Sequence, residues 1–67
     1  MFLAFNHSLI PVKRIMQIYN FEEEDGTFTI EVEFSNFEKS LILAERFATK
    51  LEMINRWCEI IRTLNKS

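Results

Sequence analysis

The strongest constraint on the fold is an amphipathic helix predicted over residues 49–65. Apolar residues recur there at helical spacing and occupy one half of the cylinder, while charged residues occupy the other. Thr49 and Glu52 have the spacing of a capping box, which indicates that the helix begins after Thr49. An apolar face this wide must be covered by a sheet, a partner helix or a second copy of the chain. It consists of Leu51, Met53, Ile54, Trp57, Cys58, Ile60, Ile61 and Leu64.

The best strand signal lies ahead of this helix, where apolar residues alternate with Thr29, Glu31 and Glu33. Alternation of this kind buries one face of a strand and leaves the other wet, which is typical of antiparallel sheets. We therefore predict a core in which this strand packs against the helix. Its predicted members are Phe28, Ile30, Val32 and Phe34 from the strand and Leu51, Ile54, Trp57 and Ile61 from the helix.

Turn-forming residues divide the rest of the chain into short strands. Asn6, His7 and Ser8 follow a short strand at Phe2–Phe5, and Asp25-Gly26 is typical of a tight hairpin turn. Ile10–Tyr19 does not alternate cleanly, so a bulged strand, a broken strand and a helical turn all remain open. The last two predicted elements are a turn at Ser35–Lys39 and a strand at Leu41–Ala44.

Size and composition favour one small non-catalytic domain spanning residues 1–67. The chain carries one cysteine, one histidine and a net charge of −2, so no internal disulfide and no metal or cofactor site is predicted. Cys58 is expected to be a buried, inert thiol and His7 a turn residue. The acidic side chains of Glu22–Asp25, Glu31 and Glu33 are expected to be solvated. The charge balance predicts no nucleic-acid partner. The single cysteine favours a reduced, cytoplasmic location.

From Leu9 to Leu64 the order of these patterns resembles the C-terminal part of a pleckstrin homology domain. The segments that carry the resemblance are IPVKRI, FTIEVEF, SLILAE and the helix that contains Trp57. The resemblance implies an α+β, mainly β fold. Three to four antiparallel strands would form a partial barrel that is capped by the C-terminal helix and amounts to about half of the family's domain.

The same resemblance implies a non-catalytic interaction module in signalling or membrane-associated scaffolding. Strands of the family that are not matched here would leave a sheet edge unpaired, so a protein partner or a second copy is expected to complete the sheet. One alternative is a self-contained homodimer with a structural or regulatory role. Another is a phosphoinositide-binding module, and indirect membrane association also remains open.

Lys13 and Arg14 are the candidate lipid or partner contacts. They are adjacent in a segment interpreted as a strand, so their side chains are expected on opposite faces, where they cannot form one pocket. Phosphoinositide-binding members of the family gather the headgroup with residues of their first strands, which have no match in this chain. The resemblance therefore does not favour a headgroup pocket.

Overall fold

The computed structural model describes residues 1–66, which form five strands, one 3-10 helix and one α-helix. A mainly β fold with antiparallel strands and a C-terminal helix was predicted, and this is confirmed. The strands number five rather than three or four. The elements in order are β1 (Phe2–Phe5), β2 (Ser8–Pro11), η1 (Val12–Arg14), β3 (Ile15–Glu22), β4 (Phe28–Asn36), β5 (Lys39–Phe47) and α1 (Lys50–Asn65).

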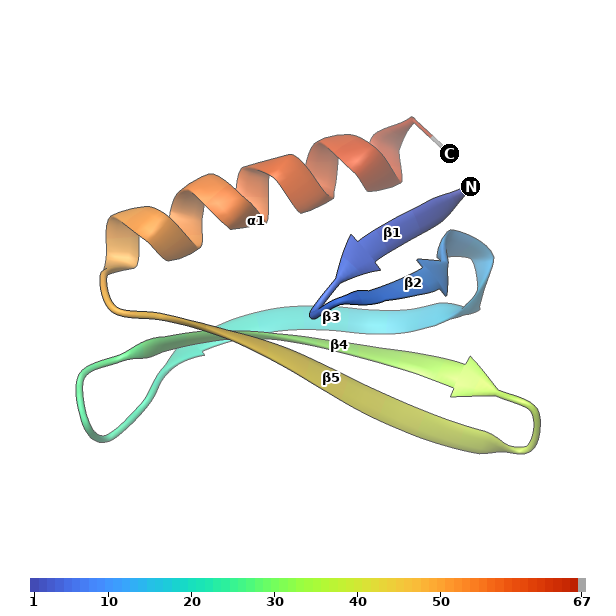
Figure 1. Ribbon diagram of the computed structural model, residues 1–67, viewed down its shortest axis with the longest axis horizontal. Coiled ribbons are helices and arrows are strands. Elements are labelled where there is room, and N and C mark those ends of the chain that lie inside the picture. Colours follow the sequence, from blue (N-terminus) through green and yellow to red (C-terminus); the bar gives the residue numbers. More distant parts are fainter. Residues whose placement is uncertain (67) are drawn as a thin grey trace.

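The strands form two antiparallel sheets that do not close into a barrel. The larger sheet has the order β3-β4-β5, and β1 and β2 form a separate hairpin. Helix α1 and this hairpin lie on the same side of the larger sheet, so the molecule has two layers (Figure 1). One face of β3-β4-β5 is therefore covered, and no element among residues 1–66 lies over the opposite face (Figure 1).

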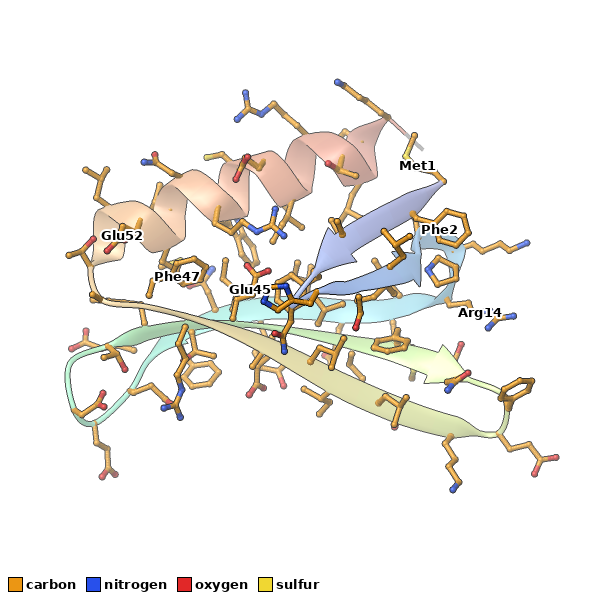
Figure 2. The ribbon with its side chains drawn as sticks, viewed as in Figure 1. Met1, Phe2, Arg14, Glu45, Phe47 and Glu52 are labelled. Atoms are coloured by element: carbon orange, nitrogen blue, oxygen red, sulfur yellow. The ribbon has the colours of Figure 1, made fainter. Side chains whose placement is uncertain are left out.

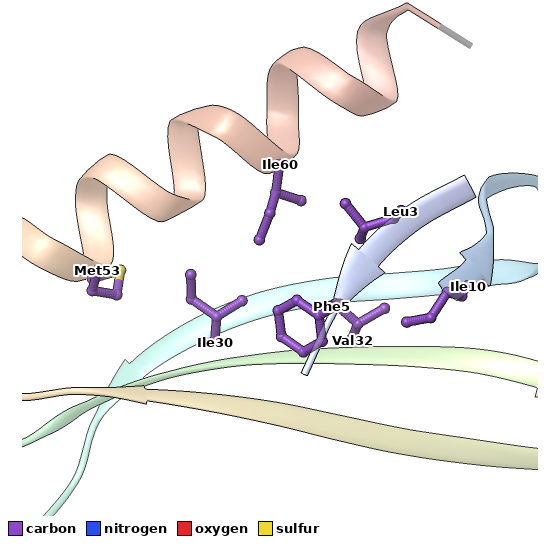
Figure 3. Close-up of a cluster of buried hydrophobic side chains, with 7 residues drawn as sticks. All are labelled: Leu3, Phe5, Ile10, Ile30, Val32, Met53 and Ile60. Carbon is purple, nitrogen blue, oxygen red and sulfur yellow. The ribbon is translucent and has the colours of Figure 1, made fainter. Parts of the chain in front are cut away.

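The core lies where α1, the hairpin and β4 meet (Figure 3). Ile30 and Val32 of β4 are fully buried beneath Ile60 of α1, as their alternation predicted. The hairpin contributes three side chains that the sequence analysis did not assign to the core. The seven buried apolar residues are Leu3, Phe5, Ile10, Ile30, Val32, Met53 and Ile60.

The prediction that Leu51 and Ile54 of α1 belong to the core is wrong, because their side chains are 68% and 41% exposed. Cys58, expected to be buried, is also exposed. The apolar arc of α1 is wider than the surface beneath it, so only part of the arc reaches the core. Trp57, Phe28 and Phe34 pack against the core while remaining partly exposed, and Ile61 is partly exposed outside the core cluster.

The hairpin turns fall where turn-forming residues predicted them. Asn6 and His7 both have positive φ, as a two-residue turn between paired Phe5 and Ser8 requires. In the next hairpin Gly26 has a φ of 87°, and its N–H donates to the carbonyl of Glu23 at 3.1 Å. Of the predicted Asp25-Gly26 pair, the glycine alone therefore takes the left-handed conformation, because the turn requires it at that position.

The irregular segment Ile10–Tyr19 contains both a helical turn and a bulge, which were alternatives on sequence grounds. Pro11 leads into η1, and the register of β3 against β4 shifts between Ile15 and Gln17. The last strand, β5, was predicted too short. It extends beyond Leu41–Ala44 at both ends because every residue from Lys39 to Phe47 has a partner in β4.

Candidate functional site

The main polar cluster joins α1, β5 and the hairpin through Arg56. Its Nε donates to Oε1 of Glu45 at 2.8 Å, and its Nη2 donates to Oε2 of the same carboxylate at 3.2 Å. Nη2 also donates to the carbonyl oxygen of Ala4 at 2.6 Å, and Glu45 accepts from the N–H of Asn6 at 2.9 Å. Glu45 lies where β5 passes the β1–β2 turn (Figure 2). The cluster therefore holds three elements in one arrangement.

The electrostatics of this cluster keep both partners charged. Burial raises the pKa of Glu45, but hydrogen bonds from Arg56 and Asn6 and the charge of Arg56 outweigh it, so the net pKa is lowered. The hydrogen bond to Glu45 raises the pKa of Arg56. The guanidinium carbon also lies 5.7 Å from the centre of the Phe5 ring. These contacts connect α1, β5 and the hairpin while both side chains stay charged.

The side chains that were considered for catalysis or metal binding do not come together. His7 lies in the β1–β2 turn and Cys58 on α1. Within residues 1–66, no group of three or more histidine, cysteine, aspartate or glutamate side chains could hold a metal ion. Glu31 and Glu33 were expected to be solvated, but each is half-buried and accepts a hydrogen bond from β3, from Tyr19 and Gln17 respectively. The bond to Glu31 raises the pKa of Tyr19.

A second apolar stripe runs along α1 outside the core. Its members are spaced by three, four and three residues, and they lie roughly 110° around the helix from the residues that face the core. Trp57 and Ile61 border a shallow groove on this flank, together with Cys58 and Arg62. We call Leu51, Ile54, Cys58 and Ile61 the outer stripe.

The free edge of β5 is a further exposed surface. Within the part of the chain that the structure describes, β5 pairs with β4 alone. Leu41 and Ile42 of β5 are 41% and 53% exposed. Nearer its end, β5 is approached by the β1–β2 turn, and Ala4–Leu9 and Ala44–Phe47 line an open groove of about 740 Å³. An apolar edge of this kind can accept another strand.

Lys13 and Arg14 do not lie in a strand, so the prediction that their side chains point to opposite faces of a strand is wrong. They form part of η1, and both side chains are exposed. The hydroxyl of Ser35 lies at 3.5 Å from the carbonyl oxygen of Arg14, so η1 sits beside the end of β4. The two basic residues are therefore close to the β4–β5 turn rather than isolated.

The cluster around Arg56 was missed because its members are far apart in sequence. Arg56 is separated from Glu45 by 11 positions and from Ala4 by 52. Arg56 belongs to the charged residues of the helix, but no spacing rule connects a helix residue to a hairpin carbonyl, and its side chain is half-buried. The outer stripe, in contrast, was visible in the sequence as part of an apolar arc that is wider than one packing face.

Comparison with known proteins assigns no relative to this arrangement. The chain matches no family model, no curated protein and no solved structure. Among residues 1–66, no helix is long and apolar enough to cross a membrane. The surfaces described above are consequently the basis for any statement of function.

Proposed function

We propose that this chain is a non-catalytic interaction module, similar to the C-terminal half of a pleckstrin homology domain, that binds a second copy of itself through α1. The observation that carries the proposal is the outer stripe. Leu51 is 68% exposed and Ile54 is 41% exposed, although the core beneath α1 is already filled by Met53 and Ile60. Apolar side chains aligned on one helix flank are typical of a contact with another helix.

The spacing of the outer stripe favours a helix as its partner. Residues 51, 54, 58 and 61 repeat at intervals of three and four, which is the pattern of the seam between two paired helices. The stripe spans about 15 Å along the helix axis, since each residue advances the helix by about 1.5 Å. A contact of this length supports weak or moderate association rather than an obligate interface.

The stripe is also complementary to its own reversed copy. In an antiparallel pair Leu51 lies opposite Ile61 and Ile54 lies opposite Cys58 of the second copy, so each larger residue meets an apolar one. The same arrangement places the exposed Arg62 of one copy at the height of Lys50 in the other, so the charges do not add to the pairing. The apolar residues alone carry the proposed twofold antiparallel dimer.

Sedimentation velocity over a range of concentrations tests the proposal. The wild-type chain is expected to show a concentration-dependent shift from monomer to dimer, and Ile54→Ser is expected to remain monomeric. Ile42→Ser is the matched control, because Ile42 is 53% exposed but lies on β5. This control should dimerise like the wild type. Circular dichroism of both variants verifies that each is folded.

Two results would contradict this function. A wild-type chain that is monomeric at every concentration would remove the second copy as the partner. Loss of the dimer in Ile42→Ser, with Ile54→Ser unaffected, would assign the contact to the free edge of β5. That result would favour completion of the sheet by an added strand.

A further inference from the structure

The charges of this protein are separated along its longest dimension, although its net charge is only −2. The acidic β3–β4 turn, with Glu24 and Asp25, lies at one end of the ribbon, and the β4–β5 turn lies at the other (Figure 1). The molecule measures 34 Å along this axis. Because electrostatic screening acts over about 8 Å at physiological salt, the two ends act as independent surfaces.

The end opposite the acidic turn combines basic and apolar side chains. Lys13 and Arg14 of η1 and Lys39 at the start of β5 are all exposed there, with Glu38 as the acidic side chain of the β4–β5 turn. Met16 lies beside this turn, where it lines the same surface depression as Phe37 and Lys39. We call Phe2, Lys13, Arg14, Met16, Phe37 and Lys39 the basic end.

Three large apolar side chains of the basic end project into solvent. Phe37 is 93% exposed, Met16 is 60% exposed and Phe2 is 58% exposed. Phe2 lines one surface depression with Lys13, and Met16 and Phe37 line another with Lys39, so apolar and basic side chains alternate over this end. Burying them would remove a large apolar area from water without any rearrangement of the fold.

The backbone at Phe37 makes this exposure more informative. Phe37 has a φ of 58°, which lies in the left-handed region. A glycine adopts this region without steric cost, whereas a phenylalanine adopts it at a cost in free energy. Its ring makes no contribution to the core in return. An unfavourable backbone position that holds an aromatic ring at a hairpin tip is evidence for a contact made by that ring.

We propose that the basic end docks on the surface of a lipid bilayer that contains anionic lipids. Phe37, Met16 and Phe2 would enter the boundary between headgroups and acyl chains, while Lys13, Arg14 and Lys39 would lie at the lipid phosphates. Interfacial binding needs this combination of apolar area and positive charge. The acidic turn points away from such a surface, so it does not oppose docking.

The side chains favour a bilayer over single-stranded nucleic acid as the partner. Nucleic-acid platforms stack successive bases on neighbouring aromatic rings. Here Phe2 and Phe37 lie on different elements, and Met16 offers no flat ring. A bilayer accepts apolar side chains at separate points, so it suits Phe2, Met16 and Phe37 better than a row of stacked bases does.

Co-sedimentation with vesicles tests the proposal. The wild-type chain is expected to bind vesicles of phosphatidylcholine mixed with phosphatidylserine, to bind pure phosphatidylcholine much more weakly, and to dissociate as salt is raised. Lys13→Gln and Arg14→Gln should each weaken binding about fivefold. Lys50→Gln is the matched charge control, because Lys50 is exposed at the start of α1 outside the basic end, and it should leave binding unchanged.

Phe37→Gly separates a contact from a structural role. Because glycine is favoured at this φ and the ring is exposed, the variant should keep or raise the thermal unfolding midpoint while binding to the anionic vesicles falls. Leu51→Ser is the matched apolar control and should bind as the wild type does. Binding that is unchanged in Phe37→Gly, or equal on both vesicle types, would overturn the proposal.

Two further measurements distinguish a bilayer from nucleic acid as the partner, and this proposal from the proposed dimer. Retention on polyuridylic acid that depends on Lys13 and Arg14 but not on Phe37, without vesicle binding, would assign the basic end to nucleic acid and overturn the proposal. The basic end shares no residue with the outer stripe. The monomeric Ile54→Ser variant should therefore still bind vesicles, and failure of one proposal is distinguishable from failure of the other.

Discussion

Arg56 holds the carboxylate of Glu45 through two hydrogen bonds, from Nε to Oε1 at 2.8 Å and from Nη2 to Oε2 at 3.2 Å. Both side chains are largely shielded, with 24% and 21% of their surfaces exposed. Because Nη2 also bonds to the carbonyl oxygen of Ala4, the pair connects α1 to both β5 and the hairpin. These contacts accompany the rotation of α1 in which Met53 and Ile60 face the core and the outer stripe faces away from it.

Arg56→Gln is expected to lower the free energy of unfolding by about 2 kcal/mol, because it leaves the half-buried Glu45 without its charged partner. Urea denaturation followed by Trp57 fluorescence measures the change. Arg46→Gln is the matched control, since Arg46 pairs with Glu23 at 3.0 Å while 70% exposed. That exposed pair should be worth less than about 1 kcal/mol. Equal losses in the two variants would contradict a special role for Arg56.

Stability should also fall in acid because of Glu45. Its pKa is lower in the folded chain than its ordinary value of 4.5, so the folded state is favoured at pH values above 4.5. This contribution is lost as the pH falls through the folded-state pKa. The difference in urea midpoint between neutral and acid pH should therefore be smaller in Glu45→Gln than in the wild type. An identical pH dependence in both proteins would show that Glu45 does not contribute.

Strand β4 shows how far alternation alone predicts the fold. Its apolar residues were expected on one face, and Ile30 and Val32 are indeed fully buried there. The cap of α1 was also predictable, because the N–H of Glu52 donates to Oγ1 of Thr49 at 3.2 Å. Both predictions depend on residues a few positions apart, which local geometry constrains directly.

The side of helix α1 that faces the core could not be predicted from the sequence. The apolar arc was recognised, but Leu51 and Ile54 were placed in the core although both are exposed. The side of α1 that is buried contacts the hairpin, through Arg56 bonded to Ala4, 52 positions away, and through the core that contains Phe5. No periodicity encodes a contact at that separation. The residues of the outer stripe were therefore recognised as apolar, but which of them face solvent could not be predicted before the core was known.

Ile60 and Leu51 give a direct test of this division of α1. Ile60→Ala should cost about 3 kcal/mol, because it opens a cavity where the side chain is fully buried. Leu51→Ala removes a side chain that is 68% exposed and should change stability by less than about 0.5 kcal/mol. Urea denaturation at a concentration where the chain is monomeric measures both. A loss above about 2 kcal/mol for Leu51→Ala would return that residue to the core.

Thr29 is the one buried polar residue among the described residues, and its hydroxyl has no hydrogen-bond partner there. It lies on the face of β4 away from α1, opposite Phe21 of β3 and Arg46 of β5, whose side chains flank it. Burying an unpaired hydroxyl is unfavourable, whereas a methyl group of the same size has no such cost. Thr29→Val should therefore raise the free energy of unfolding by about 1 kcal/mol.

Thr27→Val is the matched control for that substitution. The hydroxyl of Thr27 donates to Oδ1 of Asp25 at 2.6 Å in the β3–β4 turn, so its removal breaks a contact that Thr29 lacks. The control should be neutral or destabilising by up to about 1 kcal/mol, which is opposite in sign to Thr29→Val. Urea midpoints of both variants at one pH measure the difference. If Thr29→Val is instead destabilised, the hydroxyl of Thr29 has a hydrogen-bond partner in solution. That partner would be an ordered water or another molecule bound to this face of the sheet.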